Sequence, residues 1–159
     1  MIGTGRIHVY YGDGKGKTTA AMGLALRAAG SGLDVLMFQF LKDNSSSERV
    51  ILEQIPNVTC LPGKDRVKFV SKMNADEKAR LKHYNNKALD EILCAVQLGV
   101  LSEEKLVEFL EHKPRGLEIV LTGHVVSDKV LELADYVTEI RKVKHPYDQG
   151  ITAREGIEY

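Results

Sequence analysis

One glycine-rich segment restricts the fold of this chain more than any other: residues 12–19, Gly-Asp-Gly-Lys-Gly-Lys-Thr-Thr. Residues 7–11 before it alternate and contain Ile, Val and two Tyr, which favours a short strand. Residues 20–29 after it are rich in Ala, Leu and Met, which favours a helix. A glycine-rich turn between a strand and a helix, ending in Gly-Lys-Thr, is typical of a phosphate-binding loop. The alternative interpretation is a surface turn rich in Gly and Lys that only caps the helix.

Each residue type in this segment suits a phosphate chain. Glycines let the backbone N–H groups of Gly14 to Thr18 turn toward one anion. The helix start adds a partial positive charge and Lys17 adds a full one, while the Thr18 hydroxyl suits Mg²⁺. We therefore expect the nucleotide to contact the whole loop, which comprises Gly12, Asp13, Gly14, Lys15, Gly16, Lys17, Thr18 and Thr19.

The loop departs from the common pattern in its spacing. The usual interval of four residues before Gly-Lys-Thr would place the first glycine at Tyr11, but it stands at Gly12. The loop is therefore one residue short, and we expect it to hold a phosphate chain in a different way.

The overall composition excludes several other classes of protein. A chain of 159 residues suits one domain, residues 1–159. Basic and acidic residues balance at 22 each, so no general positive field attracts nucleic acid. Cys60 and Cys94 have no metal-ligand spacing and indicate a reduced, cytoplasmic protein. There is no signal-peptide pattern and no apolar run of about 20 residues, so we expect no membrane span.

Strands and helices are predicted to alternate along the chain. Apolar runs predict further strands at residues 34–40, 58–61, 117–122 and 136–140, and residues 67–70 suit a small strand or an extended loop. Ser45 with Glu48 predicts a capped short helix, residues 74–98 show a helical pattern, and Ser102 and Ser127 each begin a helix. This order predicts an α/β fold in three layers (α/β/α), with a mostly parallel sheet of the phosphate-loop, Rossmann-like type. Ligands bind beyond the carboxyl ends of such strands, where residues 12–19, 39–42 and 122–124 should meet.

Several segments together carry a resemblance to a known family. They are residues 39–42 (Gln-Phe-Leu-Lys), 89–92 (Leu-Asp-Glu-Ile) with Ala95 and Gly99, 120–123 (Val-Leu-Thr-Gly), 134–139 (Ala-Asp-Tyr-Val-Thr-Glu), and the ending 144–159. With the short phosphate loop, this set closely resembles the cob(I)alamin (corrinoid) adenosyltransferases of the phosphate-loop type, along nearly the whole chain.

The resemblance implies an unusual use of the loop. Members bind ATP with Mg²⁺, and the cobalt(I) ion of a reduced corrinoid attacks the 5′ carbon of the ribose. Triphosphate leaves whole, the ATP lies reversed in its loop, and no serine, cysteine or histidine base is required. The resemblance also implies a homodimer and a flavoprotein reductant, and it leaves open whether the corrinoid is cobalamin or a precursor.

The resemblance also implies roles for single residues. Lys17, Glu91 and His124 are the candidate catalytic residues, Arg27 and Phe69 the further binding residues, and Thr18, Asp90 and Glu91 the candidate magnesium residues. Glu91 is expected to make the closer contact, and Asp90 to orient it or the waters of the metal. Phe38 and Phe40 are expected near the strand ends, with Phe38 in the core.

Two departures from the family pattern affect these roles. His124 stands where the family usually has arginine after Leu-Thr-Gly. Residues 82–88 (Lys-His-Tyr-Asn-Asn-Lys-Ala) do not suit a buried central strand, so Asp90 and Glu91 fall in the middle of a predicted helix. The alternative is that the chain lacks a connection and the strand that precedes these acids in the family.

Three rival functions stay open at this point. An ordinary nucleotide hydrolase or small kinase would use Lys17, Thr18 and Glu91 at the β–γ bond. A GTPase is disfavoured, because Asn86-Lys87 is one residue out of step with the guanine-binding motif. A nucleotide-dependent corrinoid carrier would bind both ligands without turnover.

Overall fold

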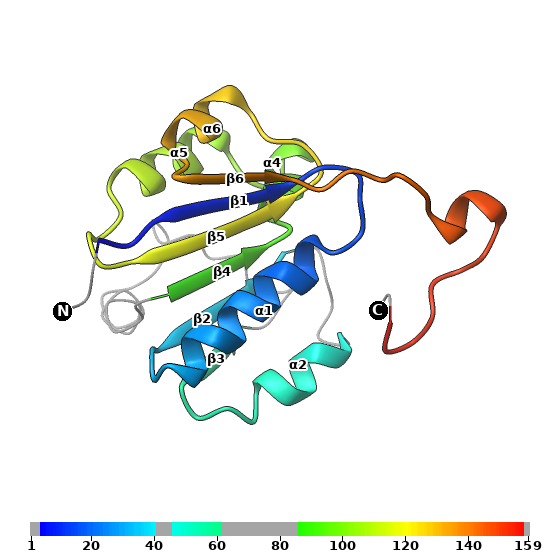
Figure 1. Ribbon diagram of the computed structural model, residues 1–159. Helices are drawn as coiled ribbons and strands as arrows, with labels where there is room; N and C mark the ends of the chain where they lie inside the picture. Colours follow the sequence, from blue (N-terminus) through cyan, green and yellow to red (C-terminus); the bar gives the residue numbers. More distant parts are fainter. Residues whose placement is uncertain (1–3, 41–45, 62–85, 158–159) are drawn as a thin grey trace.

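The computed structural model describes residues 4–40, 46–61 and 86–157 (Figure 1). The strands are β1 (Ile7–Tyr11), β2 (Val35–Gln39), β3 (Val58–Leu61), β4 (Asn86–Asp90), β5 (Glu118–Gly123) and β6 (Tyr136–Glu139). The helices are α1 (Lys17–Gly30), α2 (Ser47–Leu52), α4 (Ile92–Gln97), α5 (Glu103–Glu111) and α6 (Asp128–Leu133), with a 3₁₀ helix, η2 (Pro146–Gln149), in the tail.

The strands form one sheet in the order β3-β2-β4-β5-β1-β6, and all of its described pairings are parallel. Helices α1 and α2 cover one face, and α4, α5 and α6 cover the other (Figure 1). This arrangement confirms the predicted three-layer α/β/α fold. Because every strand runs the same way, the carboxyl ends of the strands meet at one edge of the sheet.

The core has two parts, one on each face of the sheet. Alternate residues of each strand point to opposite faces, so Val35 and Met37 of β2 pack on the α1 side, and Phe38 packs on the other. The α1 side is filled mainly by small residues of the helix: Ala25, Ala28 and Ala29. Larger residues fill the opposite side: Ile92, Leu101, Leu106, Leu110, Ile119, Leu121 and Val130. All five residues of β2 are buried, as predicted for a strand covered on both faces.

Strand β4 corrects the sequence-based interpretation. Residues 86–90 form a central strand between β2 and β5, so the prediction of a helix through these residues is wrong. Two neighbouring strands satisfy the backbone of β4, and this pairing overrides the poor strand propensity of its sequence. The alternative in which the strand is absent from the chain is also wrong, since these residues supply it.

Most other elements follow the predictions. Strands β1 and β3 have the predicted bounds. The Ser102 hydroxyl accepts a 3.4 Å hydrogen bond from the Lys105 N–H at the start of α5, as expected of a helix cap. Ser46 occupies the N-cap position of α2 without a capping hydrogen bond from its side chain. The predicted cap Ser45 lies outside the described residues, as do residues 67–70. Among the described residues, none of the helices has the length and apolar character to cross a bilayer.

Candidate functional site

The glycine-rich loop joins the end of β1 to the start of α1. Gly16 precedes the helix with φ at 115°, a conformation that favours glycine, and the helix begins at Lys17. The first helical hydrogen bond runs from the Ala20 N–H to the Gly16 carbonyl at 2.8 Å. The N–H groups of the first turn have no partner within the helix, so their partial positive charge is available to an anion.

Lys17 is held inside this loop. Its side chain is buried, and its Nζ donates a 2.8 Å hydrogen bond to the Gly14 carbonyl oxygen. A buried ammonium keeps its charge only with such partners, and an incoming phosphate oxygen is a stronger acceptor than a carbonyl. The arrangement is therefore suited to exchange the carbonyl for an anion.

The first two glycines of the loop lie close to the backbone of Ile140, the residue that follows β6. A Cβ on Gly12 would lie 2.4 Å from the Ile140 carbonyl oxygen, and one on Gly14 would lie 2.8 Å from the same atom. The Gly14 N–H also donates to Ile140 at 2.8 Å. In this structure the Gly14 N–H therefore has a backbone partner, and the predicted contact of residues 12–19 with a phosphate chain stays a prediction.

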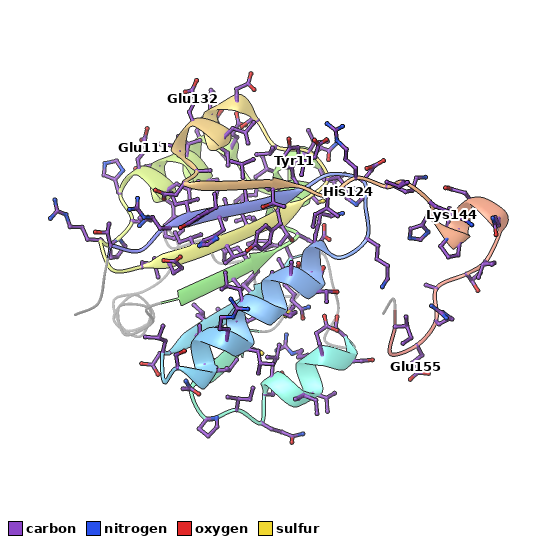
Figure 2. The ribbon with its side chains drawn as sticks, viewed as in Figure 1. Tyr11, Glu111, His124, Glu132, Lys144 and Glu155 are labelled. Carbon is purple, nitrogen blue, oxygen red and sulfur yellow. The ribbon has the colours of Figure 1, made fainter. Side chains whose placement is uncertain are left out.

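Asp13 links the loop to the C-terminal tail. Its Oδ1 accepts a 2.9 Å hydrogen bond from the Lys142 N–H. That bond holds the pKa of the exposed Asp13 carboxyl below its usual range. The tail then continues past the loop, and Lys144 lies on it well beyond His124, which stays at the edge where the strands end (Figure 2).

The tail forms one wall of a cavity of about 420 Å³ beside the loop. The opposite wall comprises Asp13, Gly14, Lys15, Lys17 and His124, and the tail contributes His145 to Tyr147 and Ile151 to Arg154. The tail contributes to the resemblance, but no pattern in its sequence predicts that it lies at the site. The polar composition of the tail did not predict a cavity wall, because the tail and the loop that line the cavity are far apart in sequence.

Asp90 and Glu91 are fixed by a short chain of hydrogen bonds. The Thr122 hydroxyl donates to Asp90 Oδ1 at 2.8 Å and accepts from the Glu91 N–H at 2.7 Å. Asp90 and Thr122 are fully buried, whereas Glu91 is partly exposed with φ at 60°. Asp90 is therefore linked to Glu91 through Thr122, and neither of these two acids is among the residues that line the cavity.

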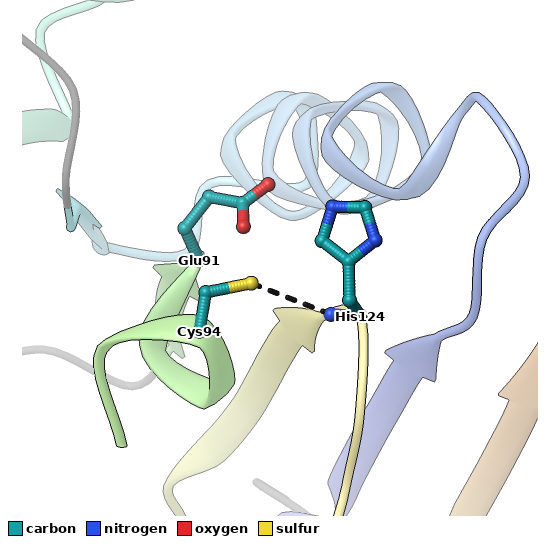
Figure 3. A group of neighbouring side chains, drawn as sticks. All are labelled: Glu91, Cys94 and His124. Atoms are coloured by element: carbon teal, nitrogen blue, oxygen red, sulfur yellow. Dashed lines mark hydrogen bonds between the residues drawn. The ribbon is translucent and has the colours of Figure 1, made fainter. Parts of the chain in front are cut away.

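Glu91, Cys94 and His124 point toward one another (Figure 3). The His124 N–H donates to Cys94 Sγ at 3.4 Å. Burial and, after it, a hydrogen bond with Glu91 raise the pKa of the Cys94 thiol to about 11, although the His124 N–H and the charge of Lys17 act in the opposite direction. Lys17 is therefore near enough to Cys94 for its charge to act on the thiol.

The other predicted residues do not join this group. Arg27 is exposed on the last turn of α1, ten residues or about 15 Å along the helix from Lys17. Phe38 and Phe40 are buried in the core with ring centroids 4.3 Å apart, so neither offers an aromatic surface to a ligand. Phe69, Leu41 and Lys42 lie outside the described residues.

Comparison with known proteins gives one consistent family. The family model described as ATP:corrinoid adenosyltransferase BtuR/CobO/CobP matches residues 3–159. The corrinoid adenosyltransferase of Escherichia coli K12 is 33% identical, over 98% of this chain and 86% of its own length. Corrinoid adenosyltransferase CobA of Salmonella typhimurium LT2 is 33% identical with the same coverage, and the Sinorhizobium enzyme is 32% identical over 98% and 80%.

Proposed function

The chain belongs to the ATP:corrinoid adenosyltransferase family, and we propose that it transfers the 5′-deoxyadenosyl group of ATP to cobalt(I) of a reduced corrinoid. The bond from the 5′ carbon to the triphosphate oxygen breaks, and the cobalt–carbon bond forms with the electron pair of cobalt(I). Triphosphate is the second product. The corrinoid, including its cobalt, is a substrate in this reaction.

The observation that carries this proposal is the buried Lys17, whose Nζ lies against Gly14 at the wall of the cavity. One fixed positive charge at a helix start suits a triphosphate, both when it binds and when it leaves. Cobalt(I) is itself a strong nucleophile, so the protein needs no general base. Its contribution is to hold the two substrates in line and to neutralise the departing polyanion.

The residues present fit a magnesium ion. The Thr18 hydroxyl at the start of α1 and the partly exposed Glu91 carboxylate are oxygen donors of the kind that Mg²⁺ prefers. When bound with ATP, the ion would supply further positive charge to the triphosphate. Asp90 acts through Thr122 as a positioning residue for Glu91. Glu91 is therefore the acid that we assign to the metal.

His124 is proposed to contact a phosphate or the substrate, since it is exposed at the cavity wall where β5 ends. Arg27 lies too far along α1 to share the phosphates held by Lys17, so its proposed contact is with another part of a ligand. Phe69 is the proposed aromatic contact for the corrinoid ring. These three roles follow from the resemblance.

The setting of the reaction is inferred in the same way. We propose a homodimer, which the exposed Tyr136 and Val137 on the edge strand β6 support. Two free cysteines support a cytoplasmic location, where a flavoprotein is the proposed source of electrons for the corrinoid. We also propose that residues 1–159 act as one domain.

A product assay tests the proposal against its rivals. Reduced cobalamin, ATP and Mg²⁺ are mixed anaerobically with the protein, and adenosylcobalamin is followed by its light-sensitive absorption spectrum. We expect adenosylcobalamin and triphosphate in equal amounts. Free phosphate without adenosylcobalamin would indicate a hydrolase or kinase, and tight binding of both ligands without product would indicate a carrier.

A further inference from the structure

The group formed by Glu91, Cys94 and His124 contains three chemically different metal donors. Their carboxylate oxygen, thiol sulfur and imidazole nitrogen all lie within 4.8 Å of one another. Glu91 and Cys94 come from the start of α4, and His124 comes from the loop after β5 (Figure 3). In the proposed reaction Glu91 binds the magnesium ion and His124 contacts a phosphate or the substrate, but the Cys94 thiol has no role.

The surrounding structure holds these donors in place. Thr122 fixes the backbone of Glu91, and the His124 N–H fixes the sulfur of Cys94. Gly123 permits this close approach, because a Cβ there would lie 2.5 Å from the Leu93 Cβ. The imidazole of His124 is on an exposed residue, so it can turn toward the other two donors without disturbing the core.

The distances suit a small tetrahedral ion. Zinc binds sulfur at about 2.3 Å and nitrogen or oxygen at about 2.0–2.2 Å, so its ligands stand about 3–4 Å apart. The three donors lie within 4.8 Å of one another, so they need to approach by only about 1 Å to reach that separation. Sulfur and imidazole favour zinc over magnesium, which takes oxygen ligands.

We propose that Glu91, Cys94 and His124 form a binding site for zinc or a similar transition-metal cation, distinct in chemistry from the magnesium site. On binding, the Cys94 thiol releases its proton to solvent and the thiolate binds the metal. His124 lines the cavity, so a fourth position stays open there to water. The site shares Glu91 with the proposed magnesium contact and His124 with the proposed phosphate or substrate contact, and only this sharing depends on the proposed function.

Zinc binding is measured on the tag-free, reduced chain of 159 residues, without ATP or corrinoid, by competition with a chromophoric chelator. We expect one zinc ion per chain at this site. Cys94→Ser and His124→Ala should each lower the zinc affinity about 100-fold, because loss of an indirect partner alone costs 10- to 100-fold. The matched controls Cys60→Ser and His112→Ala, at a half-buried cysteine and an exposed histidine, should leave it unchanged.

Cobalt(II) provides an independent test of whether the Cys94 sulfur binds the metal. The cobalt(II)-loaded chain should show a thiolate-to-metal charge-transfer band that Cys94→Ser abolishes and Cys60→Ser keeps. Circular dichroism checks that Cys94→Ser folds, and His124→Ala changes only an exposed residue. Equal zinc affinity in wild type and both site variants, or the absence of the band, would overturn the proposal. Either result leaves the adenosyl-transfer assay untouched, so the two proposals fail separately.

Discussion

Lys17 Nζ donates a 2.8 Å hydrogen bond to the carbonyl oxygen of Gly14, three residues earlier in the same loop. The ammonium is therefore positioned before any ligand arrives, and little side-chain entropy remains to be lost on binding. A loop of this kind binds an anion by exchanging one oxygen for another.

Lys17→Ala should lower the rate of adenosyl transfer at least about 100-fold, a loss typical for removal of one fixed group that stabilises developing charge. ATP affinity should fall as well, because Lys17 is the buried cation of the loop. Calorimetric titration with MgATP and the cobalamin assay measure the two effects. Lys105→Ala on the exposed surface of α5 is the control, and an unchanged rate in Lys17→Ala would refute the assignment.

Gly12→Ala should destabilise the fold and abolish ATP binding, because the new Cβ would meet Ile140 at 2.4 Å and φ is 115°. Gly23→Ala is the matched control. It lies within α1, where a Cβ meets nothing within 4 Å, so this variant should be as stable as wild type or more stable by about 0.5–1 kcal/mol. Urea unfolding measures both, and equal stability of the two variants would contradict the close approach of Ile140.

Thr122→Val should cost about 1–3 kcal/mol of unfolding free energy, because it leaves buried Asp90 and the Glu91 N–H without their shared partner. The rate of adenosyl transfer should fall too, since Glu91 loses its orientation. Thr138→Val, at an exposed position of β6, is the control for the same change of side chain. If Thr122→Val kept the stability and rate of wild type, the positioning role of Asp90 would be wrong.

Asp135 contributes to the stability of the fold at neutral pH, and this contribution is lost in acid. Its carboxylate accepts from the Ile7 N–H at 2.8 Å and from Arg6 at 2.7 Å, and these bonds, that of Ile7 above all, lower its pKa below the usual 3.8. A lowered pKa means that the contribution is present above pH 3.8 and is lost as the pH falls through the folded-state value. The stability gap between wild type and Asp135→Ala should therefore be about 1 kcal/mol at pH 7 and should close in acid.

Urea unfolding from pH 7 to pH 2.5 measures this gap, with Glu132→Ala on exposed α6 as the control for losing one acidic surface residue (Figure 2). A gap of constant size across that range would show that Asp135 contributes by packing and not by its charge.

Phe69→Ala should raise the Michaelis constant for cobalamin, because it removes the aromatic surface that we assign to the corrinoid ring. ATP affinity should stay at the wild-type value. Phe38→Ala is the informative comparison, since Phe38 is in the core and its loss should cost about 3–5 kcal/mol of stability. Unchanged cobalamin kinetics in Phe69→Ala would exclude this role.

Local patterns predicted much of this fold. The bounds of β1 came from alternation and β-branched residues, and Ser102 gave the start of α5. Strand β4 could not be predicted in this way, because a central parallel strand gains its hydrogen bonds from neighbours that are distant in sequence. Only the resemblance indicated a strand before Asp90.

The alignment with a relative shows that this chain has gaps. The alignment with the Escherichia coli enzyme spans 176 positions. It includes 98% of the 159 residues of this chain, which is about 156 residues. About 20 of the aligned positions are therefore gaps in this chain. The predicted absence of a connection before Asp90 stays a prediction, although the strand itself is present.

The sequence and the resemblance indicated single residues of the candidate site, but not the contacts between distant segments. The spacing of glycines and lysine indicated residues 12–19, and the family resemblance indicated Glu91 and His124. Two features could not be predicted, because they depend on the position of the tail after β6: the hydrogen bond from Lys142 to Asp13 and the cavity wall that the tail forms. Cys94 was passed over because its partners lie at other positions along the chain, so no metal-ligand spacing appears.

The pairing of β1 has a consequence for the order of events during synthesis. β1 is hydrogen-bonded to β5 and β6, and Asp13 meets a partner 129 residues away. At about 5–20 residues per second, the ribosome takes several seconds or more to supply those partners. The nascent loop, although translated first, acquires its final shape only after nearly the whole polypeptide has emerged. A ribosome-bound fragment that stops before residue 118 should therefore contain every residue of the loop and still fail to retain ATP.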